Sequence, residues 1–101
     1  MKTAEYLVTM NVPTELEEPM VDCLLTFESE HGFSSFPLFS HDHRNEGLSL
    51  AEQVTGRQKK IRFQVTIPES DLPLLLAKLK EDFANSGIHY WVLPVIEGGF
   101  V

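Results

Sequence analysis

The feature that most constrains the fold is a strict alternation of apolar and polar side chains between residues 61 and 67. There Ile61, Phe63, Val65 and Ile67 alternate with Arg62, Gln64 and Thr66. Successive side chains of a β-strand point to opposite faces of its sheet, so the alternation predicts a strand with one buried face. A chain of 101 residues has room for one compact domain around such a strand.

Three further segments have the pattern of strands. Residues 6–12 alternate between apolar and polar side chains. Residues 33–39 form a short aromatic segment, and Pro37 within it predicts an edge strand or a bulge, because proline cannot donate to a sheet ladder. Residues 88–96 are apolar on both faces, which predicts a strand that is covered on both sides.

Two segments carry apolar residues at helical spacing. The first stripe is Leu16, Met20, Cys23, Leu24 and Phe27, and the second is Leu72, Leu75, Leu76, Leu79 and Phe83. A capping box from Thr14 predicts the start of the first helix, although Pro19 favours either a kink or a later start near Glu18. Gly32 is expected to end this helix, and Ser70 to cap the second.

The order strand, helix, strand, strand, helix, strand predicts an α+β ferredoxin-like βαββαβ sandwich. In this fold an antiparallel sheet carries both helices on one face, and residues 1–101 form a single domain. The segment 41–56 has no periodic pattern and is expected to be a long, mobile loop. On the face that the helices leave uncovered, Leu7, Trp91 and Leu93 predict a contact between subunits, the alternative being a slightly apolar solvent-exposed surface.

The charge balance excludes several classes of partner. Eight basic and fifteen acidic residues give a formal charge of −7, which is unfavourable for binding nucleic acid or an anionic membrane surface. No apolar stretch is long enough to span a membrane, and residues 1–6 do not resemble a signal peptide. The single cysteine allows no intrachain disulfide, so we expect a reducing, cytoplasmic location.

Four basic residues gather between the end of the long loop and the start of the alternating strand: Arg57, Lys59, Lys60 and Arg62. They suit an anion or ligand cleft for a nucleotide or an acidic partner. They equally suit charge balance against the acidic first helix of a neighbouring subunit, which carries no basic residue between Glu15 and Glu30. The sequence leaves both interpretations open.

His41 and His43 lie two residues apart, so in an extended segment their imidazoles point to the same side. Neutral imidazoles bind divalent transition metals, and Glu46 could add an oxygen ligand. These three residues make an incomplete site that a neighbouring subunit would have to finish, and the alternative is a solvated polar loop. Cys23, on the apolar stripe of the first helix, is expected to be a buried structural residue.

No arrangement of residues points to an enzyme. The serines lack a neighbouring base and acid in the sequence, and there is no nucleophile elbow, phosphate-binding Walker loop or dinucleotide fingerprint. We therefore expect a protein that is not an enzyme.

Taken together, the element order, the long loop, residues 64–68 and residues 92–97 resemble the PII-like signalling proteins of the nitrogen regulatory protein PII superfamily. Residues 48–57 and 89–91 look closer still to a bacterial branch that is catalogued as a domain of unknown function. The resemblance covers nearly the whole chain.

The resemblance implies a homotrimer whose three sheets face inward. It also implies that the long loop reaches a protein partner, such as a membrane transporter, and a link to heavy-metal efflux. The loop residues expected to meet that partner are His41, His43, Glu46, Leu48, Leu50, Glu52 and Gln53.

The chain departs from typical PII proteins in the parts that hold ATP. The turn before the last strand is only Asn85-Ser86-Gly87, without the glycine-rich, lysine-bearing phosphate loop, and no arginine follows the last strand. The loop 41–56 also contains no tyrosine, so the modification known for nitrogen-regulating members has no acceptor. We expect ATP binding by the usual route to be weak or absent.

Overall fold

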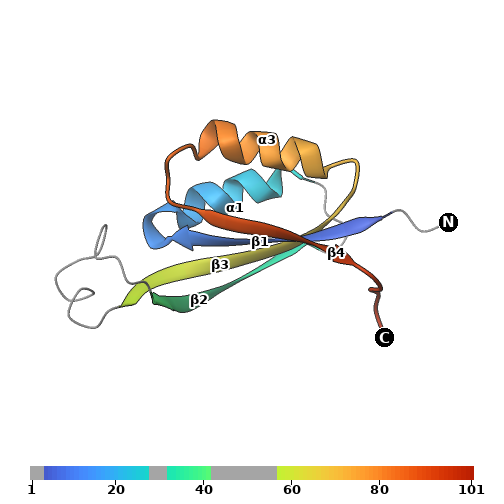
Figure 1. Cartoon of the computed structure of the whole chain (residues 1–101), viewed down its shortest axis with the longest axis horizontal. Helices are drawn as coiled ribbons and strands as arrows, with labels where there is room; N and C mark the ends of the chain where they lie inside the picture. The colour runs from blue at the N-terminus through green and yellow to red at the C-terminus, as the bar shows by residue number, and fades with distance from the viewer. Residues whose placement is uncertain (1–3, 28–31, 42–56) are drawn as a thin grey trace.

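The computed structural model describes residues 4–27, 32–41 and 57–101. Within these ranges four antiparallel strands form one sheet, and two α-helices lie on one of its faces (Figure 1). In chain order the elements are β1 (Glu5–Pro13), a 3-10 helix η1 (Thr14–Leu16), α1 (Glu17–Leu25), β2 (Phe33–His41), β3 (Arg57–Pro68), α3 (Leu72–Asp82) and β4 (His89–Val95). The predicted ferredoxin-like α+β fold is confirmed.

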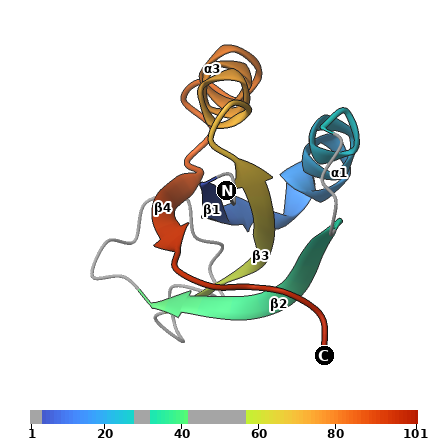
Figure 2. The same ribbon diagram turned by 90° about the vertical axis from the view of Figure 1, so that its right-hand side faces the viewer.

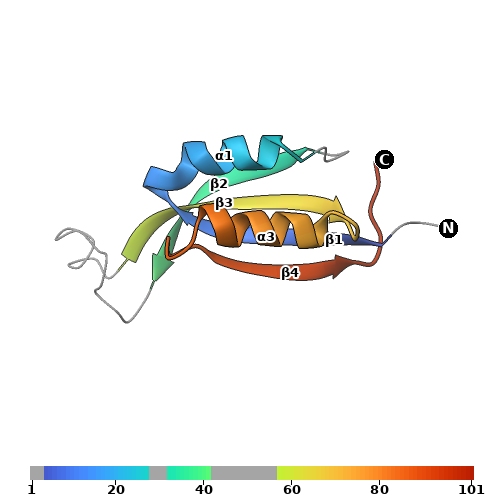
Figure 3. The ribbon, with the colours of Figure 1, turned by 90° about the horizontal axis from the view of Figure 1, so that it is seen from above.

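The strands lie side by side in the order β2-β3-β1-β4, so β3 and β1 are central and β2 and β4 are edges. Seen along the strands, α1 and α3 both lie over the same face of this sheet (Figure 2). Pro37 lies in β2, at an edge of the sheet, as the sequence predicts. Seen from above, the beginning of β1 and the C-terminus lie at one end, and the end of β2 and the beginning of β3 at the other (Figure 3).

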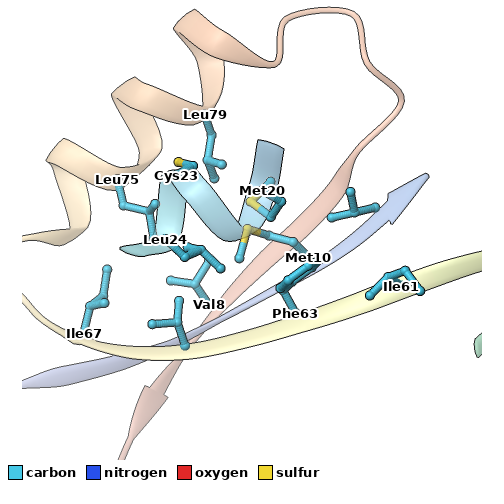
Figure 4. Packing of buried hydrophobic residues seen from close by; sticks show 12 residues of the cluster. Val8, Met10, Met20, Cys23, Leu24, Ile61, Phe63, Ile67, Leu75 and Leu79 are labelled. Carbon is cyan, nitrogen blue, oxygen red and sulfur yellow. The ribbon is translucent and has the colours of Figure 1, made fainter. Parts of the chain in front are cut away.

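The core lies between the sheet and the helices, and the alternation in β3 supplies a third of its buried apolar residues. Its members are Val8, Met10 and Val12 from β1, Met20, Cys23 and Leu24 from α1, Ile61, Phe63, Val65 and Ile67 from β3, and Leu75 and Leu79 from α3. Figure 4 shows these side chains converging from both layers. The buried face predicted for residues 61–67 is therefore the face under the helices.

The first helix begins later than the capping box at Thr14 predicts. Thr14 lies in η1, its hydroxyl donates to the carboxylate of Glu15 at 3.4 Å, and no side chain caps α1. The later start places Pro19 at the third position of α1, where a backbone N–H would have no partner within the helix. The second of the two alternatives, a late start near Glu18, is the one that occurs.

The ends of the helices also differ from the sequence predictions. Helix α1 ends at Leu25, where the hydroxyl of Thr26 donates to the carbonyl of Cys23 at 2.6 Å, so Gly32 does not end it. Gly32 has a φ of +68° directly before β2, a conformation that glycine adopts without strain. Helix α3 has Asp71 rather than Ser70 at its N-cap position. A hydroxyl at one position can bond several nearby backbone groups, so sequence alone does not choose among adjacent caps.

Strands β2 and β3 are longer than the apolar patterns predict. The second strand runs two residues past Phe39, to His41, and the third begins at Arg57 rather than at Ile61. The two extensions pair with each other, with His41 opposite Arg57. Polar and charged side chains are tolerated there because this end of the sheet is exposed. The apolar–polar alternation in the sequence therefore ends before the strand pairing does.

Two adjacent leucines of α3 test how the core is divided from the surface. Leu75 is fully buried, whereas Leu74 is 62% exposed. We expect Leu75→Ala to lower the free energy of unfolding by about 2–5 kcal/mol and the matched control Leu74→Ala by less than about 0.5 kcal/mol. Chemical denaturation measures both values, and equal losses would contradict the placement of α3.

Candidate functional site

The face of the sheet that α1 and α3 leave uncovered is called the open face below. Alternate residues of each strand form it: Phe36 and Leu38 on β2, Lys60, Arg62, Gln64 and Thr66 on β3, Glu5, Leu7, Thr9 and Asn11 on β1, and His89, Trp91, Leu93 and Val95 on β4. Leu7 pairs with Leu93, and Thr9 pairs with Trp91. The prediction that Leu7, Trp91 and Leu93 share the face opposite the helices is confirmed.

The open face exposes apolar side chains that α1 and α3 cannot reach. Leu93 is 51% exposed and Phe36 is 41% exposed, while Leu7 and Trp91 are half-buried. At the centre of the face Thr9 is only 1% exposed, between its cross-strand partners Gln64 and Trp91. An aromatic and aliphatic surface of this kind on a sheet is typical of an interface.

A cationic and aromatic cluster lies on the open face next to this apolar area. The Nε of Arg62 donates to the Oδ1 of Asn11 at 2.8 Å, and its guanidinium carbon lies 5.3 Å from the centroid of the Trp91 ring. The His89 ring lies 5.2 Å from the Trp91 ring. Asn11 is the register partner of both Arg62 and His89, so one row of side chains crosses β3, β1 and β4. The hydrogen bond and the cation–π contact hold the guanidinium at a fixed place on this face.

The four basic residues predicted as a ligand cleft lie on β3, where the strand alternation divides them into two pairs. Lys60 and Arg62 belong to the open face, whereas Arg57 and Lys59 point to the same side as the buried Ile61. The guanidinium carbon of Arg57 lies 4.1 Å from the centroid of Phe39, which is 52% exposed. The strand thus divides the group predicted from the sequence into two separate cationic places, one on each side of the sheet.

Only one of the predicted loop residues lies in the described part of the chain. His41 is exposed at the end of β2, with Arg57 as its register partner. The remaining six lie outside the described residues: His43, Glu46, Leu48, Leu50, Glu52 and Gln53. Within residues 4–27, 32–41 and 57–101, no three histidine, cysteine or acidic side chains come together as a metal site. The metal site at His41 and its neighbours remains a prediction.

Cys23 is buried in the core, as predicted, at 5% exposure. Burial raises the pKa of its thiol, although the nearby Lys78 opposes the shift and Asp82 adds to it. Lys78 and Asp82 form an ion pair at 3.3 Å on α3. The neutral form of the thiol is therefore favoured, which fits a structural role and not a nucleophile or a metal ligand.

A cleft that the sequence analysis missed lies between the end of α3 and the beginning of β4. It has a volume of about 270 Å³, and Phe83, Asn85, Ile88 and Tyr90 line it together with Leu79, Lys80 and Ala84. The turn beside it is tight, with φ of 58° at Asn85 and 83° at Gly87. The only signal in the sequence is this turn, which attracts notice there only because it lacks the phosphate loop of typical PII proteins.

Residues 2–101 match the model of a protein family described as DUF3240, proteins of unknown function. The chain belongs to the DUF3240 family. This agrees with the resemblance to a branch catalogued as a domain of unknown function. No curated protein matches the chain.

Solved structures extend the comparison to the PII-like fold. A DUF3240 family protein from Shewanella baltica superposes with a TM-score of 0.78 at 21% identity over 100% of this chain and 99% of that one. CPII from Thiomonas intermedia, a nitrogen regulatory PII-like protein bound to ADP, AMP and bicarbonate, gives 0.71 at 15% identity over 99% and 98% of the two chains. A periplasmic divalent cation tolerance protein, CutA from Archaeoglobus fulgidus, gives 0.66 at 10% identity over 93% and 86%. At these identities the likeness shows the shared fold, and the resemblance to PII-like proteins predicted from the sequence is confirmed for the fold.

No helix among the described residues is long and apolar enough to cross a membrane.

Proposed function

We propose that this DUF3240 protein is a non-enzymatic regulator of the PII-like type, which forms a homotrimer through the open face and presents residues 42–56 to a protein partner. The fold that it shares with a nitrogen regulatory PII-like protein supports the regulatory role. A membrane transporter, in particular a heavy-metal efflux pump, is the partner that the family resemblance favours.

The observation that carries the proposal is the apolar area of the open face. Leu93 and Phe36 are about half exposed there, on the side of the sheet that neither α1 nor α3 covers. Burying a large apolar side chain stabilises by about 1.5–3 kcal/mol, so covering this face with other copies of the chain would be strongly favourable. Closed threefold symmetry would cover the face on every copy equally.

The place of residues 42–56 in the chain suits a partner-binding segment. They connect His41 to Arg57, which are paired at the end of a two-stranded extension of the sheet. That end lies away from the beginning of β1 and from the C-terminus (Figure 3). At its base, the guanidinium of Arg57, which lies over the ring of Phe39, offers a positive charge to an anionic ligand that could regulate the segment.

Charged substitutions on the open face test the assembly. We expect wild-type protein to have the mass of three chains, and Trp91→Glu and Leu93→Glu to have the mass of one, because a carboxylate would be buried in the interface. The matched control Leu74→Glu, which changes an exposed leucine on α3, should remain trimeric. Light scattering measures the mass, and circular dichroism checks that each variant is folded. A monomeric wild type at micromolar concentration would refute the proposed assembly.

Substitutions in the segment test the partner. Leu48→Ser with Leu50→Ser should leave the mass and the melting temperature unchanged, but should abolish capture of a transporter from membranes of the native host. Leu74→Ser serves as the control that should still capture it. A transporter retained equally by all three proteins would show that the segment is not the binding element.

The second candidate function is a transition-metal sensor or buffer that uses His41, His43 and Glu46. Two observations favour it: His41 is exposed at the end of β2, and the fold is shared with a protein described as conferring divalent cation tolerance. The candidate requires a contribution from a neighbouring subunit, since two imidazoles and one carboxylate leave a metal coordination sphere incomplete.

Metal titration separates this candidate from the first. Zinc or copper should raise the melting temperature of wild-type protein without any partner, and His41→Ala with His43→Ala should remove the effect. The affinity should fall as the pH is lowered, because imidazole binds a metal only in its neutral form. Equal affinities of the two proteins would eliminate the histidine site.

A further inference from the structure

The charged residues of the sheet are separated by sign along the strands. The described strands contain four lysine and arginine residues, and all four lie in the first half of β3, from Arg57 to Arg62. The described strands contain one acidic residue, Glu5, which lies at the other end of the sheet. Its register partners are Pro68 on β3 and Val95 on β4. The sheet therefore has a basic end and an acidic end.

On the open face, the positive charges are those of Lys60 and Arg62 at one end, and the negative charge is that of Glu5 at the other end. Arg62 pairs with Asn11, which lies six residues along β1 from Glu5, or about 20 Å at the rise of a β-strand. An arginine side chain cannot span that distance. Arg62 and Glu5 can therefore meet only between two copies of the chain.

The side chain of Arg62 is held in place on the open face by two contacts and keeps donors for a contact of this kind. The Nε group bonds to Asn11, and the guanidinium lies beside the ring of Trp91. A guanidinium has five N–H donors in a planar fork, and in the described part of the chain Asn11 takes the hydrogen bond from one of them. The Nη groups thus remain as donors for a carboxylate, the acceptor that a planar fork fits best.

Glu5 lies at a hollow that could receive this side chain. The hollow has a volume of about 220 Å³, and Thr66 and Val95 line it with Glu5 and with Gly98, Gly99 and Phe100 of the C-terminal tail. In Figure 2 the tail crosses beneath the sheet at this end. The hollow therefore combines a carboxylate with an apolar wall on the open face itself.

We propose that copies of this chain associate head to tail through the open face, with Arg62 of one copy bound to Glu5 in the hollow of the next. The proposal rests on the assembly proposed above and names the contact that sets its register. A head-to-tail contact joins two different patches, and three such contacts form a closed ring. The opposite charges disfavour arrangements that bring two basic ends or two acidic ends together.

A charge exchange tests the pair. We expect Arg62→Glu and Glu5→Lys each to weaken association by roughly tenfold at low salt, and the double variant Arg62→Glu/Glu5→Lys to recover most of the loss. Light scattering over a concentration series measures the dissociation. Glu5→Lys leaves the Arg62–Asn11 bond intact, so its effect reports on the interface and not on the fold of the monomer.

The matched control is Lys60→Glu/Glu5→Lys, which reverses a charge on the same strand and the same face, two residues from Arg62. If long-range charge alone orders the copies, this control should recover as well as the Arg62 double variant, and the specific pair is refuted. The specific pair is also refuted if the double variant Arg62→Glu/Glu5→Lys associates no more tightly than the weaker of the two single variants. A trimeric wild type would in that case still support the proposed assembly. A monomeric wild type refutes the assembly and the pair together.

Discussion

The structure depends on one constraint, the two-residue period of the central strands β1 and β3. It places Val8, Met10 and Val12 beside Ile61, Phe63, Val65 and Ile67 on a single face. Every buried apolar residue of α1 and α3 packs against that face, so the helices have only one place to lie. The same period places Arg62, Asn11 and Thr9 on the other face, which neither α1 nor α3 covers. The core and the open face are thus consequences of the same pattern.

Much of the fold could be predicted because periodicity and topology rules restrict each other. The segments 6–12 and 61–67 alternate strictly, and the order of elements leaves few arrangements in which both helices share one face. The ends of the elements were predicted less well. Thr14, Gly32 and Ser70 are residues that favour caps, but each lies one to several residues from a real boundary, since a cap also depends on packing that sequence spacing does not record.

The candidate site could be predicted only in part, for two physical reasons. Sequence spacing placed Arg57, Lys59, Lys60 and Arg62 in one group, but an extended strand sends neighbours to opposite faces, so the group becomes two pairs. The contacts of Arg62 with Asn11 and Trp91 join residues 51 and 29 positions apart, and only the strand register brings them together. The cleft beside Asn85 and Tyr90 was missed because its walls come from the end of α3, the turn after it and the start of β4, and no local pattern encodes how these segments lie relative to one another.

The contrast between the two faces also bears on what kind of protein this is. A sheet whose second face were only a solvated surface would favour polar side chains there, yet this face carries Phe36, Trp91 and Leu93 as well as a nearly buried Thr9. Such a face is unfavourable in water and becomes favourable when it is covered. The segment proposed to reach a partner is bounded by His41 and Arg57, at the far end of β2 and β3 from the exposed Leu93. Assembly at one part of the sheet and recognition at another can therefore coexist in a chain of this size.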